Sequence, residues 1–114
     1  MADKSWTRES KPDRDVLLTM SLRFEWDREK ARSNLSRHGV SFEEALTVFA
    51  NPMARIFDDE DHSIQEEREI IIGHSAKERL LVICFTSQGE SVRIFSARKA
   101  TTAERKDYEE NVRS

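Results

Sequence analysis

Four short apolar segments after Pro52 constrain the fold more than any other feature of the sequence. They are MARIF, EREIIIG, LLVICFT and SVRIFSA, and polar connectors of hairpin length separate them: DDEDHSIQ, HSAKER and SQGE. Segments rich in β-branched and aromatic residues, spaced in this way, are typical of β-strands joined by hairpins. The pattern predicts four strands that pair antiparallel in chain order.

Two helices are predicted before these strands. Asp27 is a suitable N-cap, with Trp26 and Ala31 placed for a hydrophobic staple. We expect the first helix to run to about Arg37 and to stop at Gly39, because glycine adopts the left-handed conformation that ends many helices.

Ser41 and Glu44 have the spacing of a capping box, which predicts the start of the second helix. Its apolar residues keep the spacing of one buried helical face: Phe42, Ala45, Leu46 and Phe49. Asn51 and Pro52 are expected to end it. Thr101 and Glu104 form another capping box, so a last short helix is predicted through Tyr108 and Val112. Helices grouped apart from a meandering sheet indicate a two-layer α+β domain.

Length and charge limit the size of the protein and the ways in which it can bind nucleic acid. At 114 residues the chain is expected to form one domain. Residues 1–21 are charged and lack apolar periodicity, so we predict a flexible N-terminal extension before a folded domain at 22–114. The formal net charge of −3 argues against binding through bulk charge, so only a local basic patch could hold nucleic acid.

The expected location is the cytoplasm, without membrane association. Cys84 is the single cysteine, so no intrachain disulfide is possible and a reducing compartment is favoured. No apolar run approaches the length needed to span a membrane. Cys84 also lies among strand residues and is expected to be part of the core.

Basic residues gather where the last strand meets the last helix. Arg98 and Lys99 stand at the junction, Arg93 lies upstream on the strand, and Arg105 and Lys106 follow on the helix. Guanidinium groups beside the free N–H groups of a helix start are suited to a phosphate. The alternative is structural, with Arg98 paired to an acidic residue or to a carbonyl.

A second polar group is predicted on the first helix. Lys30, Asn34 and His38 follow the i, i+4, i+8 spacing of one helical stripe. The alternative is an ordinary solvated face that ends in a histidine at the helix C-terminus, where a cation is favourable. Arg68 precedes an apolar strand and could join a cationic site or make an ion pair within the sheet.

The acidic run Asp58–Asp61 with His62 fits neither a calcium loop nor a zinc pattern, so a solvated hairpin tip is expected and no metal or cofactor is implied.

Four longer stretches of the sequence resemble a known protein family. The segments FEWDREKARSNLSRHGVSFEEALTVFANP, EEREIIIGHS, LLVICFT and VRIFSARKATTAERKDYEE occur in an order that resembles the BrnT toxins of bacterial type II toxin–antitoxin systems over residues 23–110. The resemblance implies a RelE-like ribonuclease fold, RNA cleavage that inhibits translation, and neutralisation by a BrnA-type antitoxin. It also implies a heterotetramer of two toxins and two antitoxins, which would bind operator DNA only through the antitoxin.

The resemblance also suggests which residues form the site. Its polar positions fall on Lys30, Asn34, His38, Arg68, Arg93 and Arg98. Histidine ordinarily titrates near neutral pH, so His38 is predicted to transfer protons. The predicted catalytic residues are His38, Arg98, Arg93, Lys30 and Arg68. The predicted RNA-binding residues are Asn34, Lys99 and Arg105.

Two other interpretations of the sequence stay open. The same basic edge could belong to a non-catalytic module that binds an acidic partner or nucleic acid. A hydrolase with a metal ion in the acidic connector is the second alternative, and it predicts that chelation abolishes activity.

Overall fold

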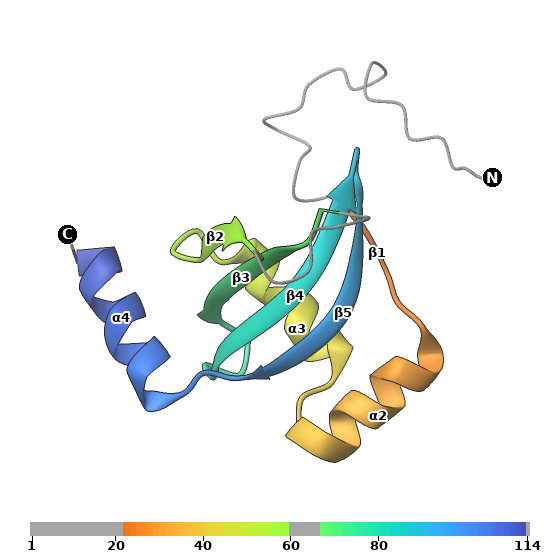
Figure 1. The fold of residues 1–114 in the computed structure, drawn as a ribbon, viewed down its shortest axis with the longest axis horizontal. Helices are drawn as coiled ribbons and strands as arrows, with labels where there is room; N and C mark the ends of the chain where they lie inside the picture. Colours follow the sequence, from red (N-terminus) through yellow and green to blue (C-terminus); the bar gives the residue numbers. More distant parts are fainter. Residues whose placement is uncertain (1–21, 60–66, 114) are drawn as a thin grey trace.

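The structure is a computed structural model that describes residues 22–59 and 67–113. The predicted extension at 1–21 and residues 60–66 of the acidic connector lie outside the described residues. The elements are, in chain order, β1 (Arg23–Glu25), α2 (Arg28–His38), α3 (Phe42–Leu46), the 3-10 helix η1 (Thr47–Ala50), β2 (Arg55–Asp58), β3 (Glu69–His74), β4 (Leu80–Gln88), β5 (Ser91–Lys99) and α4 (Thr102–Arg113), as Figure 1 shows.

Helix α2 begins and ends where the sequence predicts. The Asp27 carboxylate accepts a hydrogen bond of 3.1 Å from the N–H of Glu29. Gly39 has a φ of 69°, in the left-handed region, and its N–H donates to the carbonyl of Leu35. The cap and the stop residue are therefore confirmed.

The second helix follows its predicted start but differs beyond it. Ser41 Oγ accepts from the N–H of Glu44 at 3.0 Å. The α-helical part, α3, ends at Leu46, and η1 continues to Ala50. The Glu44 side chain does not return to Ser41 and is buried against the turn between β3 and β4. Only half of the predicted capping box is formed.

The sheet has five strands in the order β1-β5-β4-β3-β2. The four predicted strands pair antiparallel in chain order, with Ile71 opposite Ile83 and Ile83 opposite Ala97. The missing element in the prediction is β1, which pairs parallel with β5 and sets Phe24 opposite Val92. The expected four-stranded antiparallel sheet is therefore corrected to a mixed sheet of five strands.

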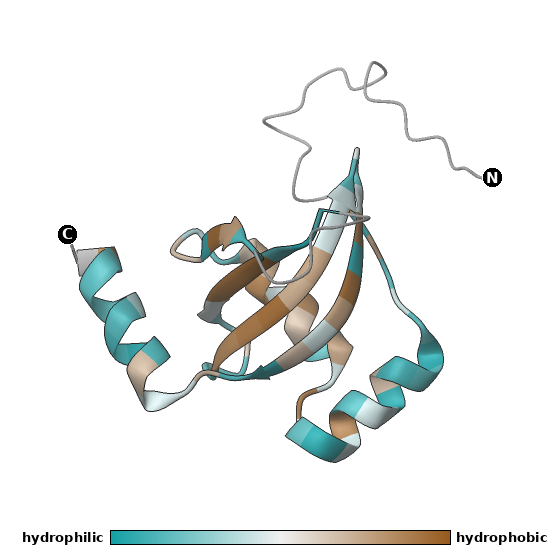
Figure 2. Cartoon of the chain, viewed as in Figure 1, coloured by the Kyte–Doolittle hydropathy of each residue, from teal (hydrophilic) through white to brown (hydrophobic). Residues whose placement is uncertain are grey.

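The two faces of the sheet carry separate apolar clusters. The first face packs against α2, α3 and η1, with Phe42, Val48, Ile83 and Ile94 at its centre. The second face holds the smaller cluster of Ile72, Leu80, Val82 and Tyr108, of which Tyr108 comes from α4. Figure 2 shows that β3 and β4 are predominantly apolar along the middle of the sheet. The domain is two-layered except at one end, where α4 adds cover to the second face.

Within residues 22–59 and 67–113, no helix is long and apolar enough to cross a membrane.

Candidate functional site

Helix α2 lies beside strand β5 and runs in the same direction. Lys30 Nζ lies 5.6 Å from the centre of the Phe95 ring. One turn later, Asn34 is hydrogen-bonded to Ala97. Four helical residues rise about 6 Å, close to the rise of two strand residues.

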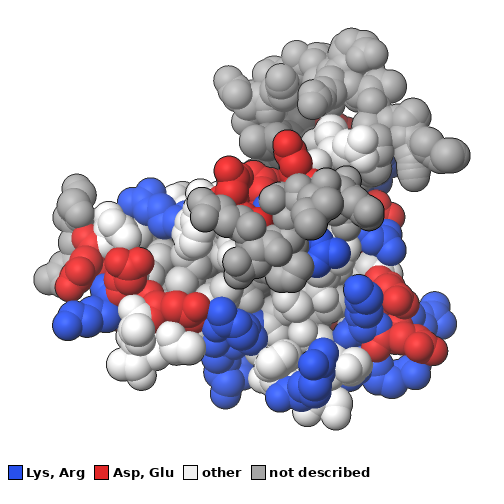
Figure 3. Space-filling view, viewed as in Figure 1, with Lys and Arg blue, Asp and Glu red and all other residues white. Residues whose placement is uncertain are grey.

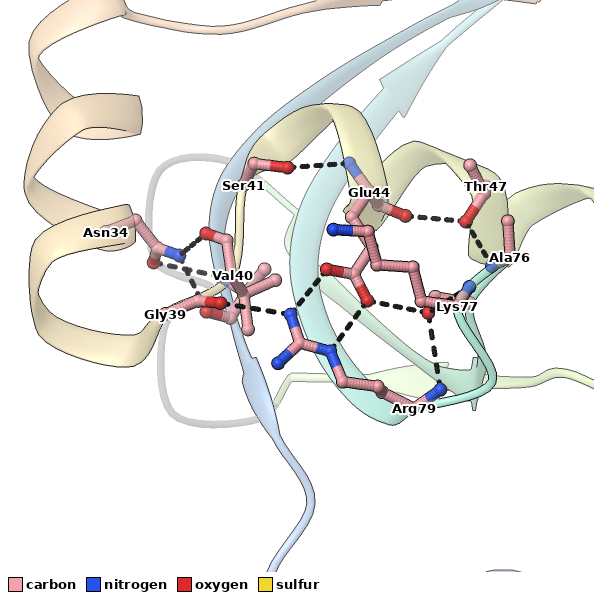
Figure 4. A network of polar contacts seen from close by, with 11 residues as sticks. Asn34, Gly39, Val40, Ser41, Glu44, Thr47, Ala76, Lys77 and Arg79 are labelled. Carbon is pink, nitrogen blue, oxygen red and sulfur yellow. Dashed lines mark hydrogen bonds and ion pairs between the residues drawn. The ribbon is translucent and has the colours of Figure 1, made fainter.

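Asn34 is a buried structural residue. Its Nδ2 donates to the carbonyls of Ala97 at 2.7 Å and Val40 at 3.0 Å, and its Oδ1 accepts from the N–H of Ala97 at 3.1 Å. Only 2% of the residue is exposed. The prediction that Asn34 contacts RNA is corrected, because its amide is enclosed and already bonded to backbone groups on both sides (Figure 4).

Three basic residues and one aromatic ring form what we call the Phe95 cluster: Lys30, Arg68, Arg93 and Phe95. Phe95 is the extra residue of a β-bulge, since Cys84 pairs with Ser96 and Phe85 pairs with Ile94. A bulge re-aims its side chain relative to the regular strand. The Arg68 guanidinium carbon lies 4.0 Å from the centre of the Phe95 ring.

Arg93 completes the cluster two residues before Phe95 on β5. Its Nη1 lies 3.7 Å from Glu25 Oε1, and both side chains are about half exposed, at 47% and 48%. An ion pair this long and this exposed contributes little to stability. Glu25 belongs to β1, so the strand that the prediction missed supplies the nearest carboxylate to this edge.

Arg98 belongs to a different group, at the start of α4. Its two terminal nitrogens donate to Glu104 at 2.8 and 2.9 Å. Glu104 also completes the predicted capping box, because Thr101 N–H donates to Glu104 Oε1 at 2.9 Å and Glu104 N–H donates to Thr101 Oγ1 at 3.1 Å. The Arg98 hydrogen bonds lower the pKa of Glu104 to about 2. The observed contacts of Arg98 are therefore those of the structural alternative, in which Arg98 pairs with an acidic residue.

The predicted site residues fall into two groups. Arg93 and Arg98 are five residues apart on one strand, about 16 Å, and His38 is eight residues from Lys30, about 12 Å along α2. His38 is half-buried at the end of α2, and Lys99 is exposed at the end of β5. Arg105 faces Glu109 on α4 at 3.9 Å. On the face in Figure 3, uncharged surface separates the groups of basic side chains.

A buried ion pair that the sequence did not reveal fastens α3 to the sheet. Glu44 accepts from Arg79 Nε at 3.0 Å and from Ser75 Oγ at 2.7 Å, and Arg79 Nη2 also donates to the Gly39 carbonyl at 3.0 Å (Figure 4). The Arg79 hydrogen bonds lower the pKa of Glu44. In a capping box, the glutamate side chain bonds to the start of its own helix. The capping-box spacing of Glu44 therefore gave no indication of its ion pair with Arg79.

Cys84 is half-buried on β4, outside both core clusters, and its surroundings disfavour the thiolate. Its Sγ lies 3.5 Å from Asp59 Oδ2, and burial together with this carboxylate raises its pKa to about 11. A nucleophilic cysteine needs the opposite shift. Across residues 22–59 and 67–113, no three histidine, cysteine, aspartate or glutamate side chains are grouped closely enough to hold a metal ion.

The fold defines a small α+β protein with a mixed five-stranded sheet and basic residues along one edge. The chain is similar to the 1.1 Å crystal structure of the Brucella abortus ribonuclease toxin BrnT, with a TM-score of 0.55, 20% identity, and coverage of 71% of this chain and 99% of that one. At this identity the likeness shows the fold alone. A comparison with curated proteins found no match.

The family follows from the sequence. The family model described as ribonuclease toxin, BrnT, of type II toxin–antitoxin systems matches residues 26–104. The chain therefore belongs to the BrnT family of ribonuclease toxins, as its motifs suggested. A type II system implies a cognate antitoxin as its partner.

Proposed function

We propose that this toxin is an endoribonuclease that needs no metal ion and that the Phe95 cluster binds RNA at the cleaved bond. The observation that carries the proposal is the convergence of Lys30 and Arg68 on the Phe95 ring, from α2 and from the start of β3. Ammonium and guanidinium groups pair with phosphate oxygens, and an aromatic ring offers a stacking surface to an unpaired base. Single-stranded RNA is the substrate class that such a combination suits.

In the proposed reaction, a base removes the proton of the 2′-hydroxyl and the 2′-oxygen attacks the adjacent phosphorus. The bond from phosphorus to the 5′-oxygen breaks, and an acid donates a proton to that oxygen. The products are a 2′,3′-cyclic phosphate and a 5′-hydroxyl. Lys30, Arg68 and Arg93 would stabilise the extra negative charge on phosphorus, which is the largest electrostatic demand of such a step.

His38 is the proposed proton-transfer residue, and Arg98 and Lys99 are proposed to contact the RNA on the same side of α2. Because His38 lies about 12 Å along the helix from Lys30, one phosphate group does not reach both residues. RNA that runs along β5 would contact the two ends of α2 through different nucleotides. Arg98 would have to exchange its bonds to Glu104 for bonds to RNA, and Arg105 would extend this contact along α4.

The test is cleavage of single-stranded RNA by the purified toxin, freed from its antitoxin, in excess chelator. We expect retained cleavage with cyclic phosphate ends, and a loss of about 100-fold or more in kcat/KM for Lys30→Ala combined with Arg93→Ala. Arg32→Ala is the matched control, because Arg32 is exposed on α2 about 200° around the helix from Lys30. Activity that depends on added metal would contradict the mechanism.

A separate pair of variants tests the other group. His38→Ala combined with Arg98→Ala should also abolish cleavage if both ends of α2 serve the reaction. Full activity in this double variant would remove His38 and Arg98 from the proposed set and leave the Phe95 cluster as the site.

The proposed cellular role is inhibition of translation in the cytoplasm by a ribonuclease with a RelE-like fold. A BrnA-type antitoxin would neutralise it in a complex of two toxins and two antitoxins, which would contact operator DNA through the antitoxin alone. One observation favours a second candidate, a non-catalytic binding module: Arg93 and Arg98 are already paired with Glu25 and Glu104. Induction of the chain alone separates the two, because a nuclease arrests growth and a binding module does not.

A further inference from the structure

A groove lies between α4 and the second face of the sheet. Its apolar lining comes from three strands and from the helix: Phe57, Ile70, Ile72, Val82 and Tyr108. Four charged residues add two charges of each sign to the lining: Arg55, Arg98, Glu104 and Asp107. Such a combination of apolar surface with a few polar groups is typical of a binding groove.

The groove is open toward β2, which is an outer strand of the sheet. Phe57 on this strand is 50% exposed and its neighbour Ile56 is 55% exposed, and Met53 just before the strand is 49% exposed. Exposed apolar side chains clustered on an outer strand mark an interaction surface more often than isolated ones do. Phe57 lines the groove, so the exposed edge of β2 continues the apolar surface of the groove on this face, whereas Ile56 points to the opposite face of the sheet.

Helix α4 is fixed at definite points rather than by a broad interface. Tyr108 is 4% exposed and its hydroxyl donates to the Met53 carbonyl at 3.0 Å. Arg98 and Glu104 hold the first turn, and Arg55 Nη2 lies 3.5 Å from the Asn111 carbonyl. The helix thus forms a wall of the groove while its remaining length stays exposed.

The groove continues into the Phe95 cluster along the row Ile72, Ile70 and Arg68. Alternate strand residues lie on one face of a sheet, about 7 Å apart, and the Arg68 side chain acts on the Cys84 thiol beside this row. At this end Lys30, Arg68 and Arg93 stand against the carboxylates of Glu25 and Asp59. Of these five described charges, three are positive and two are negative, although the whole chain has a net charge of −3.

We propose that this surface binds the cognate antitoxin, with an apolar segment of the antitoxin in the groove between α4 and β2 and acidic residues of the same segment against Arg68 and Arg93. The charge excess at one end and the exposed apolar side chains at the other specify a partner that is both apolar and acidic. Such a segment would cover the cations that the proposed function assigns to RNA. The inference rests on the proposed function in one respect: the antitoxin would silence the toxin by covering the cations that bind RNA.

The first experiment maps the interface in the whole complex. The probe is the full-length cognate antitoxin, bound to the full toxin and followed by hydrogen–deuterium exchange. We expect slower exchange in residues 55–58, 69–72 and 102–113 on complex formation. Protection confined to α2 and α3 would overturn the proposal.

The second experiment uses two matched variants, Phe57→Glu and Leu35→Glu. Leu35 is 51% exposed on α2 and Phe57 is 50% exposed on β2, so both changes place a charge on exposed apolar surface. We expect Phe57→Glu to raise the Kd for the antitoxin by about 10-fold or more, as at interface anchors, and Leu35→Glu to leave it within about twofold. Equal effects, or loss of binding only in Leu35→Glu, would contradict the groove.

A third variant tests the acidic part of the partner. Arg93→Gln should raise the Kd several-fold and make binding less sensitive to salt, and an unchanged salt dependence would contradict it. The free toxin could also self-associate through the groove. If Phe57→Glu abolishes this self-association and leaves antitoxin binding unchanged, the occupant of the groove is instead a second copy of the toxin. Binding is the readout throughout, so a toxin that fails to cleave RNA would refute the proposed function without deciding this inference.

Discussion

The side-chain amide of Asn34 is hydrogen-bonded to both backbone groups of Ala97, and so takes the place of a neighbouring strand where β1 has already ended. Strand β1 pairs with β5 only as far as Arg93. Beyond it, Asn34 satisfies backbone groups of β5 that would otherwise be buried without partners. The same amide holds Val40, so one side chain joins α2, the α2–α3 connection and the sheet.

Asn34→Ala should therefore destabilise the fold by about 2–4 kcal/mol, because it leaves several buried backbone groups unpaired. Chemical denaturation measures the change. Asn111→Ala is the control, since the side chain of this exposed asparagine donates to the Asp107 carbonyl of its own helix, and its cost should stay below about 0.5 kcal/mol. Equal costs for the two variants would show that Asn34 is not the link described.

The Arg98–Glu104 pair predicts a pH dependence of stability. The pKa of Glu104 falls from an ordinary value of 4.5 to about 2 in the folded protein. Its contribution is therefore complete above about pH 4.5 and is lost as the pH falls toward 2. Because 41% of Arg98 and 35% of Glu104 remain exposed, solvent screening limits it to about 1 kcal/mol.

Glu104→Gln should thus be less stable than the wild type near pH 7, and the difference should vanish near pH 2. Urea unfolding across this range measures it. Glu109→Gln is the control on the same helix, because its contact with Arg105 is longer, at 3.9 Å. A difference that persists at the acid end would mean that Glu104 acts through packing and not through its charge.

Cys84 should react slowly with thiol reagents. Its pKa of about 11, against an ordinary 9.0, lowers the thiolate fraction near pH 8 by about 100-fold. The rate of modification by a disulfide reagent, compared between the native and the urea-unfolded chain, measures this directly. Comparable rates in the two states would contradict a buried thiol held by Asp59.

Phe95→Leu should weaken binding of a short single-stranded RNA by about 1–3 kcal/mol, the usual worth of one stacked base. A 2′-O-methyl RNA prevents cleavage, and fluorescence anisotropy gives the Kd. Phe57→Leu is the control, because Phe57 is an exposed aromatic residue of β2, away from the cluster. Unchanged affinity in Phe95→Leu would remove the ring from the proposed RNA contact.

Local signals predicted most of the secondary structure. Asp27, Gly39, Ser41 and Thr101 each act at a helix end as their residue type indicates, and four strands follow their apolar runs. Strand β1 was missed because three residues are too few for an alternation to be recognised. Its pairing partner is nearly 70 positions away, so no local pattern reports it.

The site was less predictable, because polar residues have similar spacing whether they bind a substrate or hold a fold. Asn34 shares a helical stripe with Lys30 and His38, yet it faces β5 and is enclosed. Arg98 lies six residues before Glu104, across a strand-to-helix junction that helical spacing rules do not cover. The bulge at Phe95 depends on the register between β4 and β5, which a single strand does not encode.

The parallel contact between β1 and β5 has a consequence for the order of folding. Arg23 pairs with Ser91, so β1 finds its partner only through a contact between residues nearly 70 positions apart. The hairpins formed by β2 to β5 involve closer neighbours and are free to assemble earlier. The edge of the sheet beside Arg93 is therefore expected to form late in folding, after the four antiparallel strands have paired.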